Sequence, residues 1–313
     1  MKVNFSFLYG RKMRSKCLLV IVGPTAVGKT DLAIRLAEYY QTEIISADSR
    51  QIYRELEIGT AKPTAEELSQ ITHHFINSKS VVEEYDAGSF GREAREIIYG
   101  LFKNHNVVVM CGGSGLYIKA VVEGFDNLPD VPPGIRRKVI EEYRQHGLEW
   151  LQQEVASTDP QYYEIVDRQN PQRLMRAIEI FRSSGTAFSG FLNKEKVGFP
   201  FIVAKIGLER ERMELYHRID TRIDDMIARG LFLEAEKFFT FRHHHALQTV
   251  GYQEVFEFLE GVCDRDEATR LMKRNSRRYA KRQLTWFKKD AEIQWFHPDD
   301  WEGILKRTKK MNQ

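Results

Sequence analysis

The sequence contains little cysteine and no long hydrophobic run. Its 313 residues include 3 cysteines, Cys17, Cys111 and Cys263, which lie far apart. This spacing excludes a disulfide framework and a CxxC zinc site, and it is typical of a reducing compartment, so we expect a cytoplasmic protein. The longest apolar run, Cys17 to Val22, is too short to span a membrane, so we expect no membrane partner.

The chain also has almost no net charge, although its basic residues are unevenly placed. Lys and Arg number 47 against 44 Asp and Glu, which gives a formal charge of +3. The segment 270–289 nevertheless holds nine basic residues and no acidic one. Such a run is usually a solvated helix face, but the lack of neighbouring carboxylates favours contact with phosphates, and nucleic acid is the obvious polyanion.

Alternating strand and helix patterns fill the first part of the chain. Short apolar runs predict strands at Cys17–Val22, Glu43–Asp48 and Asn106–Gly113. Helical periodicity predicts helices at Asp31–Tyr40 and Phe90–Phe102. This order is typical of an open parallel sheet with helices on both faces, so the sequence predicts an α/β fold class.

The composition changes after the turn-rich stretch LPDVPPG. The segment 130–198 has an almost wholly helical pattern and predicts a helical insertion domain, after which a strand at Phe199–Leu208 returns the chain to the sheet. The core is then expected to comprise residues 16–129 and 199–313, including the basic C-terminal helices. Residues 1–15 are expected to form a disordered extension.

The segment GPTAVGKT matches the phosphate-binding (P-loop) pattern G-x-x-x-x-G-K-[ST] between a predicted strand and a predicted helix. In this pattern the loop amides and the helix N-terminus bind phosphate oxygens, Lys29 supplies a positive charge, and the Thr30 hydroxyl can hold a metal ion. The structural alternative is a glycine turn with an incidental lysine. The expected phosphate or diphosphate site comprises Gly23, Pro24, Thr25, Ala26, Val27, Gly28, Lys29 and Thr30.

A second strand-end carboxylate, which nucleoside triphosphatases use to hold Mg²⁺, is missing beside this loop. The most apolar strand ends in a GGSG turn, whose Ser114 hydroxyl could approach the same anion. The strand-end acid that is present, Asp48, is followed by Ser49, Arg50 and Gln51. These polar residues suggest a clasp for a second, hydrogen-bonding substrate, although Asp48 could also be a metal ligand or a turn and N-cap residue.

Six sequence blocks resemble tRNA dimethylallyltransferases and occur in the order seen in that family. They are GPTAVGKT, ISADSRQIYRELEIGTAKP (Ile45–Pro63), GGSGLYIKA (Gly112–Ala120), NPQRLMRAIEI (Asn170–Ile180), VGYQE (Val250–Glu254) and KRQLTWF (Lys281–Phe287). The resemblance extends from about Leu18 to Trp295. It implies transfer of a dimethylallyl group from dimethylallyl diphosphate to the exocyclic amine of the adenosine just 3′ of the anticodon, giving isopentenyladenosine and diphosphate.

The resemblance also implies roles for individual residues. Asp48 is the expected general base for the amine proton. The departing diphosphate is expected to be stabilised by the phosphate-binding loop, by Arg222 and by Mg²⁺ on Thr30, the implied cofactor. Ser114 stands where the family usually has Thr and keeps the hydroxyl. With Asp48 and Arg222 it completes the expected catalytic set.

The expected macromolecular partner is the anticodon stem-loop of tRNA, from which the target adenosine must be flipped out of its stack. We expect the chain to act as a monomer. The residues expected to contact tRNA, through the resemblance or as part of the basic run, are Asp48, Ser49, Arg50, Gln51, Ser114, Arg136, Gln172, Arg173, Leu174, Met175, Arg176, Gln248, Gly251, Tyr252, Gln253, Arg274, Arg277 and Arg278.

Three other functions remain open on the sequence. An adenylate prenyltransferase that acts on free AMP or ATP would need neither the helical insertion nor the basic helix. A P-loop kinase of small molecules would need the strand-end carboxylate that is missing here. A nucleic-acid-binding module without catalysis would leave Asp48, the phosphate-binding loop and the GGSG turn without a role.

Overall fold

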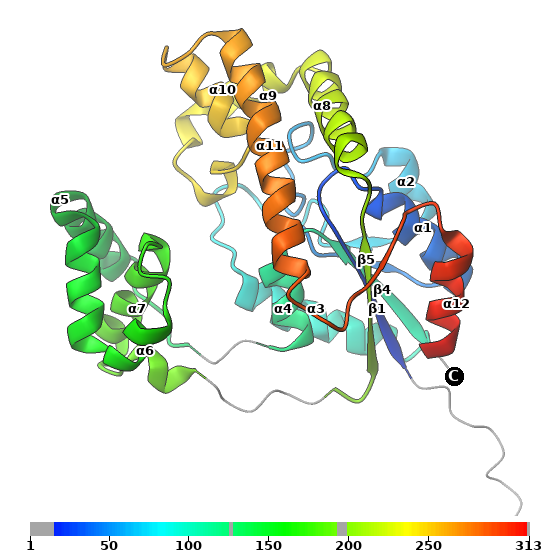
Figure 1. The fold of residues 1–313 in the computed structure, drawn as a ribbon, viewed down its shortest axis with the longest axis horizontal. Coiled ribbons are helices and arrows are strands. Elements are labelled where there is room, and N and C mark those ends of the chain that lie inside the picture. Colours follow the sequence, from blue (N-terminus) through cyan, green and yellow to red (C-terminus); the bar gives the residue numbers. More distant parts are fainter. Residues whose placement is uncertain (1–15, 125–127, 193–198, 312–313) are drawn as a thin grey trace, which may run out of the picture. The chain divides into compact units, whose positions relative to one another are not determined.

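The computed structural model describes residues 16–124, 128–192 and 199–311 and divides into two compact units (Figure 1). The core unit comprises Met1–Val122 and Phe199–Gln313, and the insertion unit comprises Glu123–Gly198. The insertion unit begins before residue 130, where the sequence predicted its start. The extension predicted at residues 1–15 lies outside the described residues.

Parallel strands form the centre of the core unit. They are β1 Cys17–Val22, β2 Ile44–Ser46, β3 His73–His74, β4 Val107–Gly112, β5 Ile202–Leu208 and β6 Gln294–Phe296, in the spatial order β3-β2-β4-β1-β5-β6. All neighbouring pairs are parallel. Every residue of β1 is buried, as its continuous apolar run requires. The parallel sheet predicted from the sequence is therefore confirmed.

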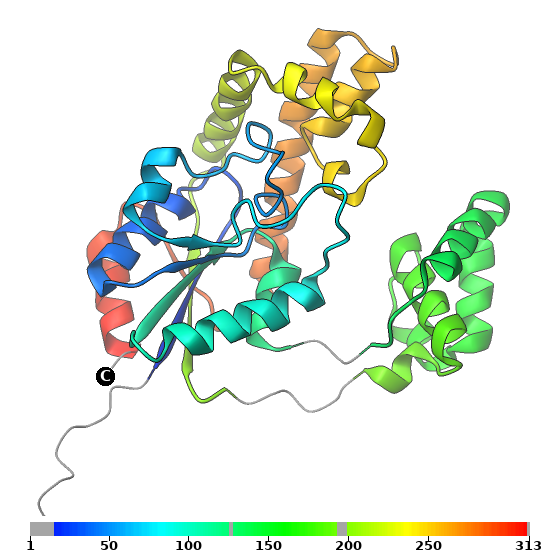
Figure 2. The same cartoon turned by 180° about the vertical axis from the view of Figure 1, so that it is seen from behind.

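Helices cover both faces of this sheet. α1 Lys29–Tyr40 and α12 Trp301–Met311 lie on one face, and α3 Ala87–Leu101 and α4 Gly115–Val122 lie on the other (Figure 1 and Figure 2). This division follows from right-handed crossovers between parallel strands. The other core helices are α2 Ala65–Gln70, α8 Arg212–Ala228, α9 Leu231–Lys237, α10 Tyr252–Leu259 and α11 Arg265–Phe287. In the part of the chain that the structure describes, no helix is both long and apolar enough to cross a membrane.

Three strands are shorter than the sequence predicted, and one of them, β4, lacks a single predicted residue at each end. β5 begins at Ile202 and not at Phe199, and its pairing with β1 begins opposite Cys17. β2 ends at Ser46 because the Asp48 carboxylate accepts hydrogen bonds from the backbone N–H groups two and three residues later and so starts a turn. The turn places this acid at the carboxyl edge of the sheet.

The basic helix α11 packs beside α8, which supplies it with carboxylates (Figure 1). Arg277 Nη1 lies 2.7 Å from both carboxylate oxygens of Asp220, and Lys273 Nζ lies 2.6 Å from an oxygen of Asp224. The expectation that the basic run has no balancing acids is therefore wrong, because the acids come from a helix distant in sequence. Arg278, in contrast, is exposed.

The insertion unit is helical, with α5 Pro133–Thr158, α6 Pro160–Ile165 and α7 Pro171–Ser184. α5 is broken at Gly147, whose φ of 74° lies in the left-handed region that favours glycine. The unit has a hydrophobic core of its own, formed by Val139, Leu151, Val155, Val166, Leu174, Ala177 and Ile178. Its helices therefore bury their apolar faces against one another without help from the sheet.

A buried carboxylate in the core unit fixes the loop 57–59. Glu234 on α9 is 9% exposed and accepts hydrogen bonds from the three backbone N–H groups of this loop at 2.8 to 3.1 Å. The Tyr252 hydroxyl donates to the same carboxylate at 2.6 Å. The tyrosine ring also packs so closely that a Cβ atom on Gly59 would lie 2.5 Å from it. One carboxylate thus joins α9, α10 and the loop.

We expect Glu234→Ala to lower the free energy of unfolding by about 3 kcal/mol or more, because three N–H groups and a hydroxyl would lose their buried acceptor. Tyr252→Phe removes one donor and leaves the three N–H bonds in place, so its expected loss is about 1 kcal/mol. Urea denaturation of both variants measures the difference. Equal losses in the two variants would contradict this role of the carboxylate.

Candidate active site

The phosphate-binding loop connects the carboxyl end of β1 to the start of α1. Gly23 has a φ of 151°, and a Cβ atom there would lie 2.7 Å from the Leu208 carbonyl oxygen, so only glycine fits. Ala26 and Gly28 also have positive φ angles, of 64° and 107°. These conformations curl the loop so that successive N–H groups can converge on an anion at the helix N-terminus.

Lys29, the first residue of α1, directs its ammonium group back to the loop. Nζ donates to the Pro24 carbonyl at 2.6 Å and to the Gly23 carbonyl at 3.0 Å. Burial lowers the pKa of Lys29 to about 8, and the negative charge of Asp48 offsets part of this effect. Burial of the charged ammonium therefore costs free energy, and a bound anion would reduce this cost.

The loop borders a cavity of about 130 Å³, which we call the inner cavity. Its wall brings the loop together with the carboxyl ends of β2 and β4 and with side chains of α8 and α11. The lining residues that matter below are Thr25, Lys29, Thr30, Asp48, Arg222 and Tyr279. The structure thus collects the predicted diphosphate site, the predicted base and the predicted arginine in one place.

A wider cavity of about 370 Å³, the outer cavity, adjoins the inner one. The two share wall residues, among them Thr25, Asp48, Arg222 and Tyr279. The outer cavity also gathers predicted tRNA contacts from distant parts of the core unit, namely Ser49, Arg50, Gln248, Gly251 and Gln253. Asp48 and Arg222 therefore lie between an anion-binding pocket and a polar opening.

Asp48 forms a turn and lines both cavities. Its Oδ1 accepts hydrogen bonds from the Arg50 N–H at 2.9 Å and the Gln51 N–H at 3.3 Å, so the turn interpretation is correct for this oxygen. The carboxylate also belongs to the wall of each cavity. Beside it, the Ser114 hydroxyl accepts a hydrogen bond from the Ser49 N–H at 2.9 Å and so fixes the segment that carries Asp48.

Two arginines of α8 approach the loop. Arg222 Nη1 lies 3.5 Å from Thr25 Oγ1, and burial, followed by the charge of Arg218, lowers the pKa of Arg222. Arg218 donates from Nε to the Ala26 carbonyl at 2.9 Å and also lines the inner cavity. Together with Lys29 they surround one small cavity with positive charge, which suits a multiply charged anion.

Two side chains of α11 that the sequence did not single out complete the inner cavity. Gln283 is 6% exposed, accepts a hydrogen bond from the Thr25 N–H at 2.8 Å and donates to the Gly113 carbonyl at 3.0 Å. Tyr279 lines both cavities, and burial, followed by the charge of Asp48, raises the pKa of its hydroxyl to about 12. Tyr279 and Gln283 lie four residues apart and therefore on one face of the helix. This spacing is present in the sequence of the basic segment 270–289, among its many charged residues.

Burial corrects two of the predicted tRNA contacts. Tyr252 and Leu174 are both 0% exposed, the first bonded to Glu234 and the second in the insertion-unit core. Met175 also packs against that core and is partly buried. Any block of consecutive residues on an amphipathic helix includes inward positions, which a continuous motif cannot separate from the outward ones. The side chains of Tyr252 and Leu174 stabilise the fold and offer no surface to RNA.

The remaining predicted contacts of the insertion unit lie around α7. Gln172 and Arg173 are exposed. Arg136 Nε and Arg176 Nη1 lie 3.7 Å and 3.4 Å from the same oxygen of Glu179, a carboxylate whose side chain is 8% exposed. Glu179 therefore orients two partly exposed guanidinium groups toward one surface of this unit.

Comparison with known proteins gives a consistent result. A family model described as IPP transferase matches residues 51–290. The tRNA dimethylallyltransferase of Cytophaga hutchinsonii is 49% identical over 286 residues, which cover 91% of this chain and 94% of the relative. The tRNA dimethylallyltransferase of Christiangramia forsetii is 48% identical over 286 residues, covering 91% and 95%.

Solved structures share the fold over almost the whole chain. The full-length tRNA isopentenylpyrophosphate transferase from Bacillus halodurans superposes with a TM-score of 0.68 at 36% identity, covering 95% of both chains. A eukaryotic dimethylallyltransferase acting on tRNA, at 24% identity, gives a TM-score of 0.74 and covers 95% of this chain and 77% of that one. The resemblance carried by the six sequence blocks is confirmed, and the chain belongs to the IPP transferase family.

Proposed function

We propose that this chain transfers the dimethylallyl group of dimethylallyl diphosphate to the exocyclic amine of the adenosine just 3′ of the anticodon in tRNA. The observation that carries the proposal is the shared wall of the two cavities. There Thr25, Asp48 and Arg222 stand between the phosphate-binding loop and a wider cavity lined by both polar and apolar side chains. Similarity to proteins named tRNA dimethylallyltransferase supports the same reaction.

The inner cavity suits the diphosphate of the substrate. The loop N–H groups, Lys29 and Arg222 would bind its oxygens, and Arg218 adds a further positive charge. Negative charge grows on the leaving oxygen as its bond to the allylic carbon breaks, and donors fixed in advance stabilise that charge without rearrangement. These residues would therefore stabilise the transition state more than the bound substrate.

The outer cavity suits the flipped adenosine. The amine nitrogen forms a bond to the allylic carbon while the bond from that carbon to the diphosphate oxygen breaks. The nitrogen then carries an additional proton, which Asp48 accepts as general base. Because Oδ1 of Asp48 already accepts two backbone hydrogen bonds, Oδ2 is the oxygen available for this proton.

Mg²⁺ fits the inner cavity as a partner of the diphosphate. The Thr30 hydroxyl lines this cavity at the start of α1, and the carboxylates of Asp31 and Asp48 belong to the same wall. Mg²⁺ commonly takes one or two protein oxygens and fills its other positions with water and substrate phosphate. When bound, it would neutralise part of the diphosphate charge. Among the described residues no cluster of three or more His, Cys, Asp or Glu side chains could hold a metal, so the substrate would supply most ligands.

Exposed and partly exposed basic side chains of both units are candidates for contact with tRNA. In the core unit they include Arg50 at the outer cavity and Arg278 on α11. In the insertion unit they include Arg136, Arg173 and Arg176. We also propose that the chain acts as a monomer.

Transfer of radioactive label from dimethylallyl diphosphate tests the proposal directly. The assay contains Mg²⁺ and offers unmodified tRNA, free AMP or free ATP as acceptor in parallel reactions. We expect label in tRNA alone. Label in the free nucleotide would instead assign an adenylate prenyltransferase, and label in no acceptor would contradict the proposal.

We expect Asp48→Asn to lower turnover by about a hundredfold to ten-thousandfold, because a general base contributes that much to a proton transfer. The asparagine oxygen can still accept the two N–H bonds that form the turn, so the affinity for tRNA should change by less than about threefold. Single-turnover transfer and filter binding measure the two quantities. Turnover equal to that of the wild type would remove Asp48 as the base.

The pKa of Lys29 predicts how diphosphate binding depends on pH. Without ligand the pKa of Lys29 is lowered to about 8, whereas a bound anion favours the charged ammonium. Binding of diphosphate above pH 8 should therefore be accompanied by uptake of a proton. For the same reason the affinity for diphosphate should fall as pH rises. Titration of inorganic pyrophosphate above pH 8, in buffers of different ionisation enthalpy, measures this uptake. The side chain in Lys29→Arg stays charged, so this variant should lack the proton uptake. The comparison therefore separates titration of Lys29 from titration of pyrophosphate. Equal proton uptake by both proteins would refute the assignment.

A further inference from the structure

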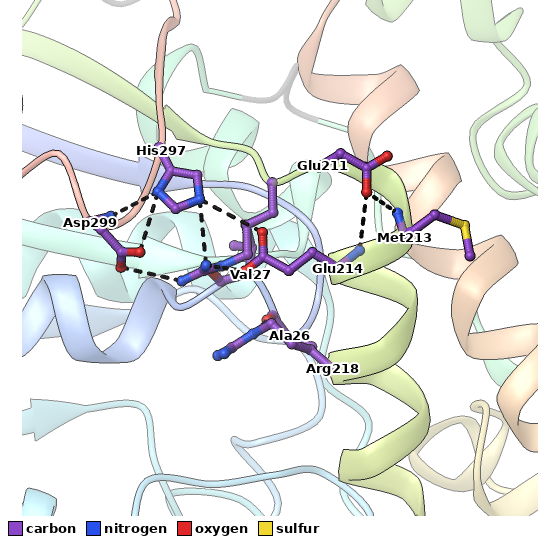
Figure 3. A network of polar contacts seen from close by, with 9 residues as sticks. Ala26, Val27, Glu211, Met213, Glu214, Arg218, His297 and Asp299 are labelled. Carbon is purple, nitrogen blue, oxygen red and sulfur yellow. Dashed lines mark hydrogen bonds and ion pairs between the residues drawn. The ribbon is translucent and has the colours of Figure 1, made fainter.

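Two carbonyl groups of the phosphate-binding loop are held by arginines. Arg210, which precedes α8, donates from Nε to the Val27 carbonyl at 3.0 Å. Arg218 donates to the Ala26 carbonyl at 2.9 Å (Figure 3). Arg218 lines the inner cavity, whereas Arg210 lines neither the inner nor the outer cavity. Arg210 therefore contacts the loop without a place in the wall that would meet the substrate.

Peptide geometry links these carbonyls to the anion-binding N–H groups. In a trans peptide the C=O and the following N–H point in opposite directions. Holding the Val27 carbonyl therefore fixes the direction of the Gly28 N–H, and holding the Ala26 carbonyl fixes that of the Val27 N–H. Within the described residues no backbone carbonyl accepts a hydrogen bond from either N–H group. Both remain available to a phosphate oxygen.

Arg210 can orient the loop because its own guanidinium is fixed. Its side chain is 9% exposed and forms ion pairs with Glu214 on α8 and, at 3.5 Å, with Asp299. His297 Nε2 lies 3.5 Å from Arg210 Nη1. Figure 3 shows Glu214, His297 and Asp299 gathered beside Val27. The support for the loop thus comes from α8 and from the turn after β6, two segments far apart in sequence.

The turn after β6 also lies close to the loop. A Cβ atom on Gly28 would lie 3.5 Å from Pro298 Cβ and 3.8 Å from a terminal nitrogen of Arg210. The peptide unit between Val27 and Gly28 is therefore held on its carbonyl side by a hydrogen bond from Arg210, and Pro298 lies near its Gly28 side. This is the point at which the loop enters α1.

We propose that Arg210 is a positioning residue for the diphosphate, which acts through the Val27 carbonyl to aim the Gly28 N–H at the bound anion. The inference rests on the proposed function, which places the diphosphate in this loop. A donor that is already oriented stabilises developing charge without reorganisation, so loss of this support weakens the binding of the anion before and during the reaction. Arg210 itself contacts no substrate atom.

Titration of inorganic pyrophosphate with Mg²⁺ into Arg210→Met tests this assignment. The expected affinity is about tenfold weaker than that of the wild type, the effect of a misdirected hydrogen bond to a charged group. Lys205→Met is the matched control. Lys205 is 10% exposed and pairs with Asp290 and Glu292, both at 2.7 Å, on a part of β5 outside both cavities. It should leave the pyrophosphate affinity within about twofold.

Kinetics distinguish positioning from a general loss of stability. In Arg210→Met the KM for dimethylallyl diphosphate should rise about tenfold, while the KM for tRNA should stay within about twofold. A purely structural role would lower the Tm and the active fraction in both variants and leave both KM values unchanged. Unchanged KM values in Arg210→Met would overturn the inference.

The remaining outcomes separate this inference from the proposed function. Pyrophosphate affinity in Arg210→Met equal to that of the wild type overturns the inference alone, whereas failure of the wild type to bind pyrophosphate overturns the proposed function. If Arg210→Met does not fold, Glu214→Gln weakens the ion pair that holds Arg210 and should lower the affinity about threefold. Unchanged affinity in Glu214→Gln would then overturn the inference.

Discussion

A buried ammonium group is the constraint on which the candidate site depends. Lys29 Nζ donates hydrogen bonds to two carbonyl groups of its own loop instead of to water. α8 brings Arg218 and Arg222 to the same cavity. Positive charges confined to so small a space repel one another, and the folded chain must hold them there before an anion arrives. The loop meets this need by directing its carbonyl groups to cations. Among its N–H groups, those of Val27 and Gly28 are left for the anion.

The edge of a parallel sheet brings the remaining groups into place. β1 ends in the phosphate-binding loop, β2 leads into Asp48, and β4 leads into the turn with Ser114. Because neighbouring parallel strands end at one edge, three segments far apart in sequence form a single wall. α8 and α11 close that wall from the other side with Arg222 and Tyr279. The inner and outer cavities thereby have a common boundary.

Local patterns predicted the sheet, the loop and Asp48, since each depends on residues adjacent in sequence. The sequence did not predict contacts that depend on tertiary packing. Gln283 bonds to Thr25 N–H across 258 positions, and Arg277 is neutralised by an acid on α8, so neither is visible in a short window. The burial of Tyr252 was missed for a related reason, because a sequence block does not show which helix face turns inward.

Glu234 has a consequence for where a phosphate can bind. Three successive N–H groups converge at the loop 57–59, an arrangement that forms an anion-binding nest elsewhere in proteins. These three N–H groups lie directly before Thr60 and Ala61, which line both cavities. The Glu234 carboxylate already fills this nest. The N–H groups of residues 57–59 are therefore bonded to the protein's own carboxylate, whereas those of Val27 and Gly28 in the phosphate-binding loop are not.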